Sequence, residues 1–195
     1  TTGAKTLVNK GSVETAGLTF NNVKNLVDVR VEATNADTTV NFIATAVAGT
    51  ADNVNVMLNG VGVPTDRPDV TLGGNNIESL TISTMGAASQ LGNIASAGTK
   101  TVTVTGDQAL RATFMANTIA TLDASAATGK LNLNVALAGA VDQTITLGTA
   151  NDNVTVAGLT AKDTITGGEG TDRVTLADAG TNEATKMVGV EQIGV

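Results

Sequence analysis

The sequence contains no cysteine, histidine, tryptophan or tyrosine, and has only two prolines and three phenylalanines in 195 residues. The absence of cysteine excludes disulfides and thiolate metal sites. The absence of histidine excludes Ser-His triads and histidine-based acid–base chemistry. Aromatic residues, at 2% of the chain, provide almost none of the platforms that accompany the paired carboxylates of glycosidases. We therefore expect no enzyme active site, and interpret the adjacent Asp66 and Arg67 as a solvated loop pair.

Positive charge is also scarce, with 11 Lys and Arg against 18 Asp and Glu and a net charge of −7. No Lys/Arg cluster is present, so the sequence does not predict a nucleic-acid surface. No apolar run approaches the ~18 residues that span a bilayer, so we expect no membrane insertion. The chain starts at Thr1 without Met or signal peptide and stops within an alternating stretch, Val190 to Val195. We therefore expect residues 1–195 to be a segment of a longer protein.

Apolar residues alternate with polar ones along most of the chain, which is the pattern of half-buried strands. Clear examples are Val102-Thr103-Val104 and the stretch from Leu131 to Leu137. The intervening residues are mostly Thr, which suits a pleated exposed face, and Asn, which stacks in ladders when strands lie in parallel register. Short strands, small residues and 22 glycines predict an all-β fold, a parallel β-helix or β-roll-like solenoid. A β-sandwich is the alternative.

A loose internal repeat supports the solenoid, because residues 22–26 recur as residues 76–80 and, with one insertion, as residues 117–122. Two stretches interrupt the alternation. Residues 59–69 contain both prolines and predict a surface loop. Residues 107–119 predict a short helix, because Asp107 is a possible N-cap ahead of Leu110 and Phe114.

The segment Gly167 to Thr175, Gly-Gly-Glu-Gly-Thr-Asp-Arg-Val-Thr, fits the calcium-binding nonapeptide G-G-x-G-x-D-x-U-x, in which U is a large apolar residue. Glycines permit positive φ in the turn, and the aspartate supplies a hard oxygen ligand. Three D-x-U units begin at Asp152, Asp163 and Asp172, 11 and then 9 residues apart. Asp152 and Asp172 should share one edge of the solenoid, and Asp163 should lie on the opposite edge.

The predicted Ca²⁺ site therefore consists of Asp152 and Asp172, assisted by backbone carbonyls near Gly168 and Gly170, with Asp163 as a further candidate ligand. Ala replaces the second glycine of the first two units, at residues 150 and 161. The alternative interpretation is that all three units are plain Asx turns that lead into strands.

The C-terminal part of the chain resembles RTX-type surface-layer (S-layer) proteins and related type I-secreted, calcium-binding surface proteins of Gram-negative bacteria. The resemblance covers residues 117–195 and rests on residues 122–131, the D-x-U units, residues 167–174 and residues 189–193. We accordingly divide the segment into an N-terminal β part, residues 1–116 with the proline loop 59–69, and an RTX-like β-helical part, residues 117–195.

The resemblance implies a secreted, extracellular protein at the cell surface, with a calcium-dependent architecture and export without an N-terminal signal. It also implies that copies assemble through lateral lattice contacts into a paracrystalline coat. The expected function is thus a structural segment of a self-assembling surface-layer protein. Alternatives are a segment of an RTX adhesin and the non-catalytic calcium module of a secreted enzyme. A cell-surface polysaccharide, bound through another domain, is a further expected partner.

Overall fold

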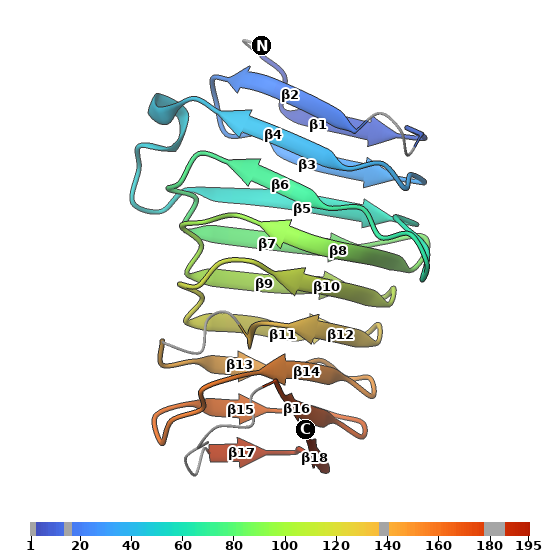
Figure 1. Cartoon of the computed structure of the whole chain (residues 1–195), viewed down its shortest axis with the longest axis vertical. Helices are drawn as coiled ribbons and strands as arrows, with labels where there is room; N and C mark the ends of the chain where they lie inside the picture. The colour runs from blue at the N-terminus through green and yellow to red at the C-terminus, as the bar shows by residue number, and fades with distance from the viewer. Residues whose placement is uncertain (1–2, 14–16, 137–140, 178–185) are drawn as a thin grey trace.

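A computed structural model describes residues 3–13, 17–136, 141–177 and 186–195. The chain forms a parallel β-solenoid of about 8 turns, in which successive strands alternate between two nine-stranded sheets. Figure 1 shows the coils stacked along the long axis of the molecule, with the N-terminus at one end. All strand pairs within the two sheets are parallel. The predicted all-β solenoid is confirmed, and the alternative sandwich is wrong.

Sheet A contains the odd-numbered strands: β1 (Thr6–Lys10), β3 (Asp28–Glu32), β5 (Asn53–Asn59), β7 (Ser79–Thr84), β9 (Thr101–Gly106), β11 (Thr121–Ala127), β13 (Thr144–Thr146), β15 (Thr164–Thr166) and β17 (Lys186–Val188). Sheet B contains the even-numbered strands: β2 (Leu18–Val23), β4 (Thr38–Phe42), β6 (Val70–Gly73), β8 (Ser89–Ala95), β10 (Leu110–Phe114), β12 (Leu131–Asn134), β14 (Asn153–Val156), β16 (Arg173–Leu176) and β18 (Gln192–Gly194).

The core consists of columns of apolar side chains that repeat once per coil. One column runs through sheet A, and its members occupy matching register positions and are almost fully buried: Val54, Leu80, Val102, Leu122, Ile145 and Ile165. Their polar neighbours along each strand face outward, because successive side chains of a strand point to opposite sides. Medium-sized aliphatic residues fill this thin interior closely, which explains how the chain folds with so few aromatic residues.

The helix predicted over residues 107–119 is wrong. Leu110–Phe114 forms strand β10 of sheet B, in which Leu110, Ala112 and Phe114 are buried and alternate with outward-facing residues. The spacing of Leu110 and Phe114 fits a helix, but the small apolar Ala112 completes a period of two, and the neighbouring strands satisfy the backbone. A 3₁₀ turn, η1 (Ala44–Val47), lies between β4 and β5. No helix in the described part of the chain has the length and apolarity to cross a membrane.

The predicted proline loop joins β5 to β6, and its tip is closed by an antiparallel bridge between Val63 and Asp66. Asp66 and Arg67 form no ion pair in the described structure. Both sheets continue without interruption past residues 116 and 117, so the two predicted parts contribute coils to the same stack. The division of the chain at this point stays a prediction.

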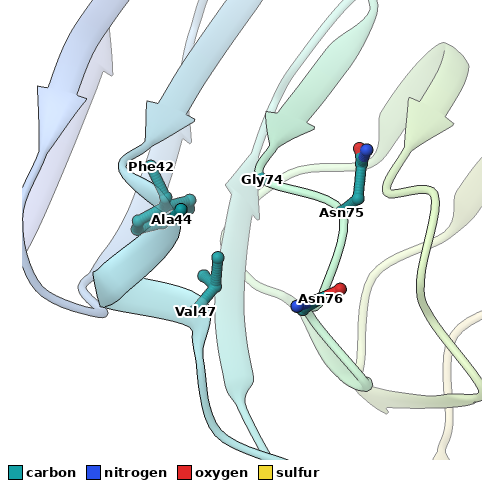
Figure 2. Close-up of a pocket in the computed structure, with 6 residues that line it drawn as sticks. All are labelled: Phe42, Ala44, Val47, Gly74, Asn75 and Asn76. Carbon is teal, nitrogen blue, oxygen red and sulfur yellow. The ribbon is translucent and has the colours of Figure 1, made fainter.

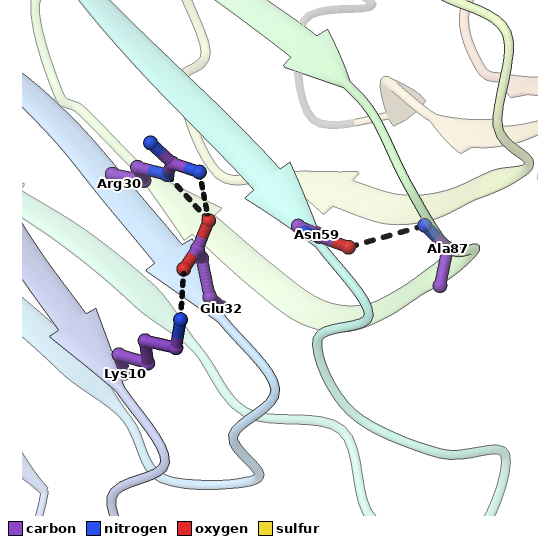
Figure 3. A network of polar contacts seen from close by, with 5 residues as sticks. All are labelled: Lys10, Arg30, Glu32, Asn59 and Ala87. Carbon is purple, nitrogen blue, oxygen red and sulfur yellow. Dashed lines mark hydrogen bonds and ion pairs between the residues drawn. The ribbon is translucent and has the colours of Figure 1, made fainter.

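A charged network lies at the N-terminal end of sheet A (Figure 3). Glu32 is buried and forms two ion pairs. Lys10 Nζ lies 3.3 Å from its carboxylate, and Arg30 both pairs with this carboxylate and donates a hydrogen bond to it. Burial alone would raise the pKa of Glu32, but the hydrogen bonds from Arg30 and Lys10 outweigh it and lower the pKa. On the next coil the Asn59 side-chain oxygen accepts the backbone N–H of Ala87 at 3.1 Å. The Lys10–Glu32 and Asn59–Ala87 contacts join neighbouring coils at the sheet margin, whereas Arg30 and Glu32 belong to the same strand.

Candidate functional site

Three carboxylates stack at one corner of the solenoid, immediately before three successive strands of sheet B. Asp152, Asp172 and Glu191 precede β14, β16 and β18, and the strand register places them at the same position of neighbouring coils. Asp152 N–H donates to Asp172 Oδ1 at 2.8 Å, and Asp172 N–H donates to Glu191 Oε2 at 2.7 Å. Each carboxylate therefore caps the backbone of the preceding coil. The structure brings Asp152 and Asp172 together as expected.

Each oxygen of Asp152 already has a hydrogen-bond partner. Its Oδ1 accepts the backbone N–H of Leu131 at 2.8 Å, and its Oδ2 accepts that of Gly148 at 3.0 Å. Asp163 is bonded in the same way at the other corner, where it precedes β15 of sheet A. Its two oxygens accept the backbone N–H groups of Gln143 and Thr160. These two aspartates thus satisfy the backbone of the preceding coil and of their own turn, but through N–H groups that precede them rather than through the N–H two residues on that defines an Asx turn.

Asp172 differs from both, because one of its oxygens has no partner. The residue is completely buried, its Oδ1 accepts Asp152 N–H, and no donor reaches Oδ2 from the described residues. A Cβ added to Gly167 would lie 2.6 Å from Asp172 Oδ2 and would overlap the carbonyl oxygen of Gly189. Both oxygens therefore converge on the space that the glycine leaves open. A buried carboxylate oxygen without a donor requires a counter-charge, a proton or water.

The electrostatics of the corner disfavour two free negative charges. Burial raises the pKa of Asp172, and the charge of Glu191 raises it further. The hydrogen bond from Asp152 N–H lowers this pKa but does not offset the rise. Burial likewise raises the pKa of Asp152, although the N–H groups of Leu131 and Gly148 oppose the shift. The repulsion between Asp172 and its neighbours would be relieved by a cation placed among them.

Gly168 and Gly170 are required by the packing of the same turn. Both have positive φ, 94° and 112°, a conformation that glycine adopts readily. A Cβ at Gly168 would overlap the carbonyl oxygen of Gly148, and one at Gly170 would lie 2.5 Å from that of Ala150. The nonapeptide glycines therefore let one turn stack directly on the turn before it.

The two oxygen atoms that border the space beside Gly167, Asp172 Oδ2 and the Gly189 carbonyl, suit calcium better than a transition metal, since calcium takes oxygen ligands. The Gly189 carbonyl and the exposed Glu191, whose side chain accepts Asp172 N–H, are missing from the site predicted from sequence. The signal for Glu191 is an acidic residue that recurs 20 positions after Asp152, at Asp172, and again 19 positions later. In the part of the chain that the structure describes, no three His, Cys, Asp or Glu side chains gather around one point. Backbone carbonyls and water would have to complete a calcium shell of 6–8 oxygens.

A pocket of about 360 Å³ lies beside the 3₁₀ turn, between the coils that carry β4 and β6 (Figure 2). Its lining is Phe42, Ala44, Val47, Gly74, Asn75 and Asn76. These side chains include no acid, base or nucleophile, so the pocket lacks the groups that acid–base or covalent catalysis requires.

The chain matches no protein-family model, no curated protein and no solved structure. The arguments for its function therefore rest on the residues themselves and on their arrangement.

Proposed function

We propose that the chain is a non-catalytic structural segment of a secreted bacterial surface-layer protein that assembles with copies of itself in a calcium-dependent manner. The observation that carries this proposal is the unpartnered Oδ2 of the buried Asp172, which faces the Gly189 carbonyl. Calcium bound there, with Glu191 as a second carboxylate, would supply the missing counter-charge. Asp152 and Asp163 would remain backbone caps.

The shape and charge of the molecule support a scaffold. Coils that repeat in register form a stiff rod, because every coil contacts its neighbours over both sheets. The outward faces carry mostly Thr, Asn and Ser, which present little of the apolar surface that causes aggregation. A net charge of −7 makes copies repel one another, and bound divalent cations would reduce that repulsion.

The decisive experiment follows the assembly of the purified protein by light scattering and negative-stain electron microscopy as calcium is added and then chelated. We expect ordered sheets in calcium, soluble monomers in chelator, and sheets again when calcium is restored. Magnesium should substitute poorly, because it requires tighter octahedral coordination and retains its water. A protein that stays monomeric at millimolar calcium would refute self-assembly, and tight binding of one receptor or sugar instead would favour the adhesin.

A further inference from the structure

A second polar feature lies on the outward side of sheet B, over coils that precede the coil of Asp172 in the stack. It is a pocket of about 210 Å³ whose polar lining consists of Arg67, Gln90, Arg111, Lys130 and Asn132. Gln90, Arg111 and Asn132 occupy one register position of β8, β10 and β12. Lys130 precedes β12, and Arg67 comes from the proline loop. Stacking of the coils thus brings together residues up to 65 positions apart in sequence, from Arg67 to Asn132. We call these five residues the basic groove.

The basic groove concentrates positive charge in an acidic protein. It holds three of the 11 Lys and Arg side chains of a chain whose net charge is −7. None of the three forms an ion pair with a described residue, and no carboxylate lines the pocket. The buried Asp152 is close enough to Lys130 for this lysine to favour its charged form, but the two side chains form no ion pair. The three cations are therefore available to an external anion.

The remaining side chains suit a hydroxylated ligand. Gln90 and Asn132 offer amide donors and acceptors beside the cations. The volume of the groove equals that of about seven liquid waters at roughly 30 Å³ each, which is space for one sugar unit. The outward column continues beyond the groove through Asn153 and Arg173. Since strands repeat every ~4.8 Å, the guanidinium-bearing positions 111 and 173, three strands apart, are separated by roughly 14 Å.

We propose that the basic groove binds an acidic polysaccharide, with a carboxylate-bearing sugar in the pocket and the polymer running across the strands along this column. Charge complementarity favours an anion, the amides favour a carbohydrate, and the one-position-per-coil repeat favours a linear polymer. A second copy of the chain is a weaker fit, because Asp152, Asp163 and Asp172 are buried at the corners and Glu191 is the one exposed member of the stacked row. This inference does not depend on calcium or on self-assembly.

The test is isothermal titration calorimetry of the whole chain with hexagalacturonate. The buffer contains EDTA, so that calcium cannot bridge protein and ligand. We expect binding that weakens as salt is raised, since screening reduces attraction between exposed charges, and no binding of the neutral maltohexaose. The double variant Arg111→Gln and Lys130→Gln should bind at least about tenfold more weakly, because it removes two charge-assisted contacts. The matched control, Lys100→Gln with Lys186→Gln, removes the same charge beside sheet A and should bind like the wild type.

A second readout needs no variant. Addition of hexagalacturonate should shift the side-chain amide NMR signals of Gln90 and Asn132 in the wild-type protein, and leave those of Asn53 and Asn55 in β5 unchanged. Equal losses of affinity in both double variants, equal binding of the neutral sugar, or shifts confined to other residues would overturn the proposal. So would a wild type that ignores the acidic sugar while the groove variant alone loses self-association in sedimentation, because the groove would then contact another copy.

Discussion

The replacement Asp172→Asn tests whether Asp172 Oδ2 truly lacks a partner in the protein. Asparagine has the same shape, and its oxygen can still accept Asp152 N–H as Asp172 Oδ1 does. Its amide nitrogen would take the place of Oδ2 and offer a donor toward the Gly189 carbonyl. The change also removes the charge of a carboxyl group whose pKa is raised by burial and, further, by the neighbouring charge of Glu191. In chelator we therefore expect the variant to be more stable than the wild type.

The size of the expected stabilisation follows from the cost of leaving Asp172 Oδ2 without a hydrogen-bond partner. An unpaired buried polar atom costs about 1–3 kcal/mol, so recovery of about 1–2 kcal/mol is expected, or roughly 2–8 °C in Tm for a chain of this length. In calcium at 100 times its Kd the order should reverse, because the wild type gains about 2.7 kcal/mol and the variant gains nothing. Far-ultraviolet circular dichroism is the suitable assay, since the chain has neither Trp nor Tyr.

Asp152→Asn is the matched control, because it makes the same chemical change one coil away with the opposite expected result. Both Asp152 oxygens accept backbone N–H groups, from Leu131 and Gly148. An amide nitrogen in either place would face a donor, leaving it unsatisfied at a cost of about 1–3 kcal/mol. If both variants are destabilised alike in chelator, Asp172 Oδ2 is not an orphan and the reasoning fails.

Two further perturbations test the fold away from this corner. Because the pKa of Glu32 is lowered from its ordinary value of 4.5, its stabilising effect is full above that pH and is lost as pH falls through the lowered folded-state value. Glu32→Gln should therefore melt below the wild type at pH 7, with the two curves converging in acid; a difference that is constant with pH would contradict this. Gly106→Ala should lower Tm far more than Gly3→Ala, although φ is 110° and 109°, because only the Cβ at Gly106 would overlap the carbonyl of Thr84. Equal losses would show that backbone conformation, rather than close approach between coils, accounts for both effects.

Much of the architecture could be predicted from the sequence, because alternation is a local property. Residues such as Val102 and Val104 identify strands without knowledge of their partners, and the excess of small residues favours a thin solenoid. Local reasoning failed at residues 107–119, where Leu110 and Phe114 match a helical spacing and Ala112 carries little hydrophobic signal. The neighbouring strands of sheet B decided that segment in favour of β10.

For the candidate sites, too, the sequence predicted part of the arrangement and the tertiary structure decided the rest. The D-x-U spacing was enough to place Asp152 and Asp172 on one edge, since alternate turns of a solenoid with two strands per coil lie on the same edge. The spacing could not show that both oxygens of Asp152 accept hydrogen bonds while Asp172 Oδ2 accepts none. That difference depends on which backbone N–H groups reach each oxygen. Nor could the spacing assemble the basic groove from Arg67, Arg111 and Lys130. Turns of unequal length separate the coils, and only the register set by packing and backbone hydrogen bonding determines which side chains become neighbours.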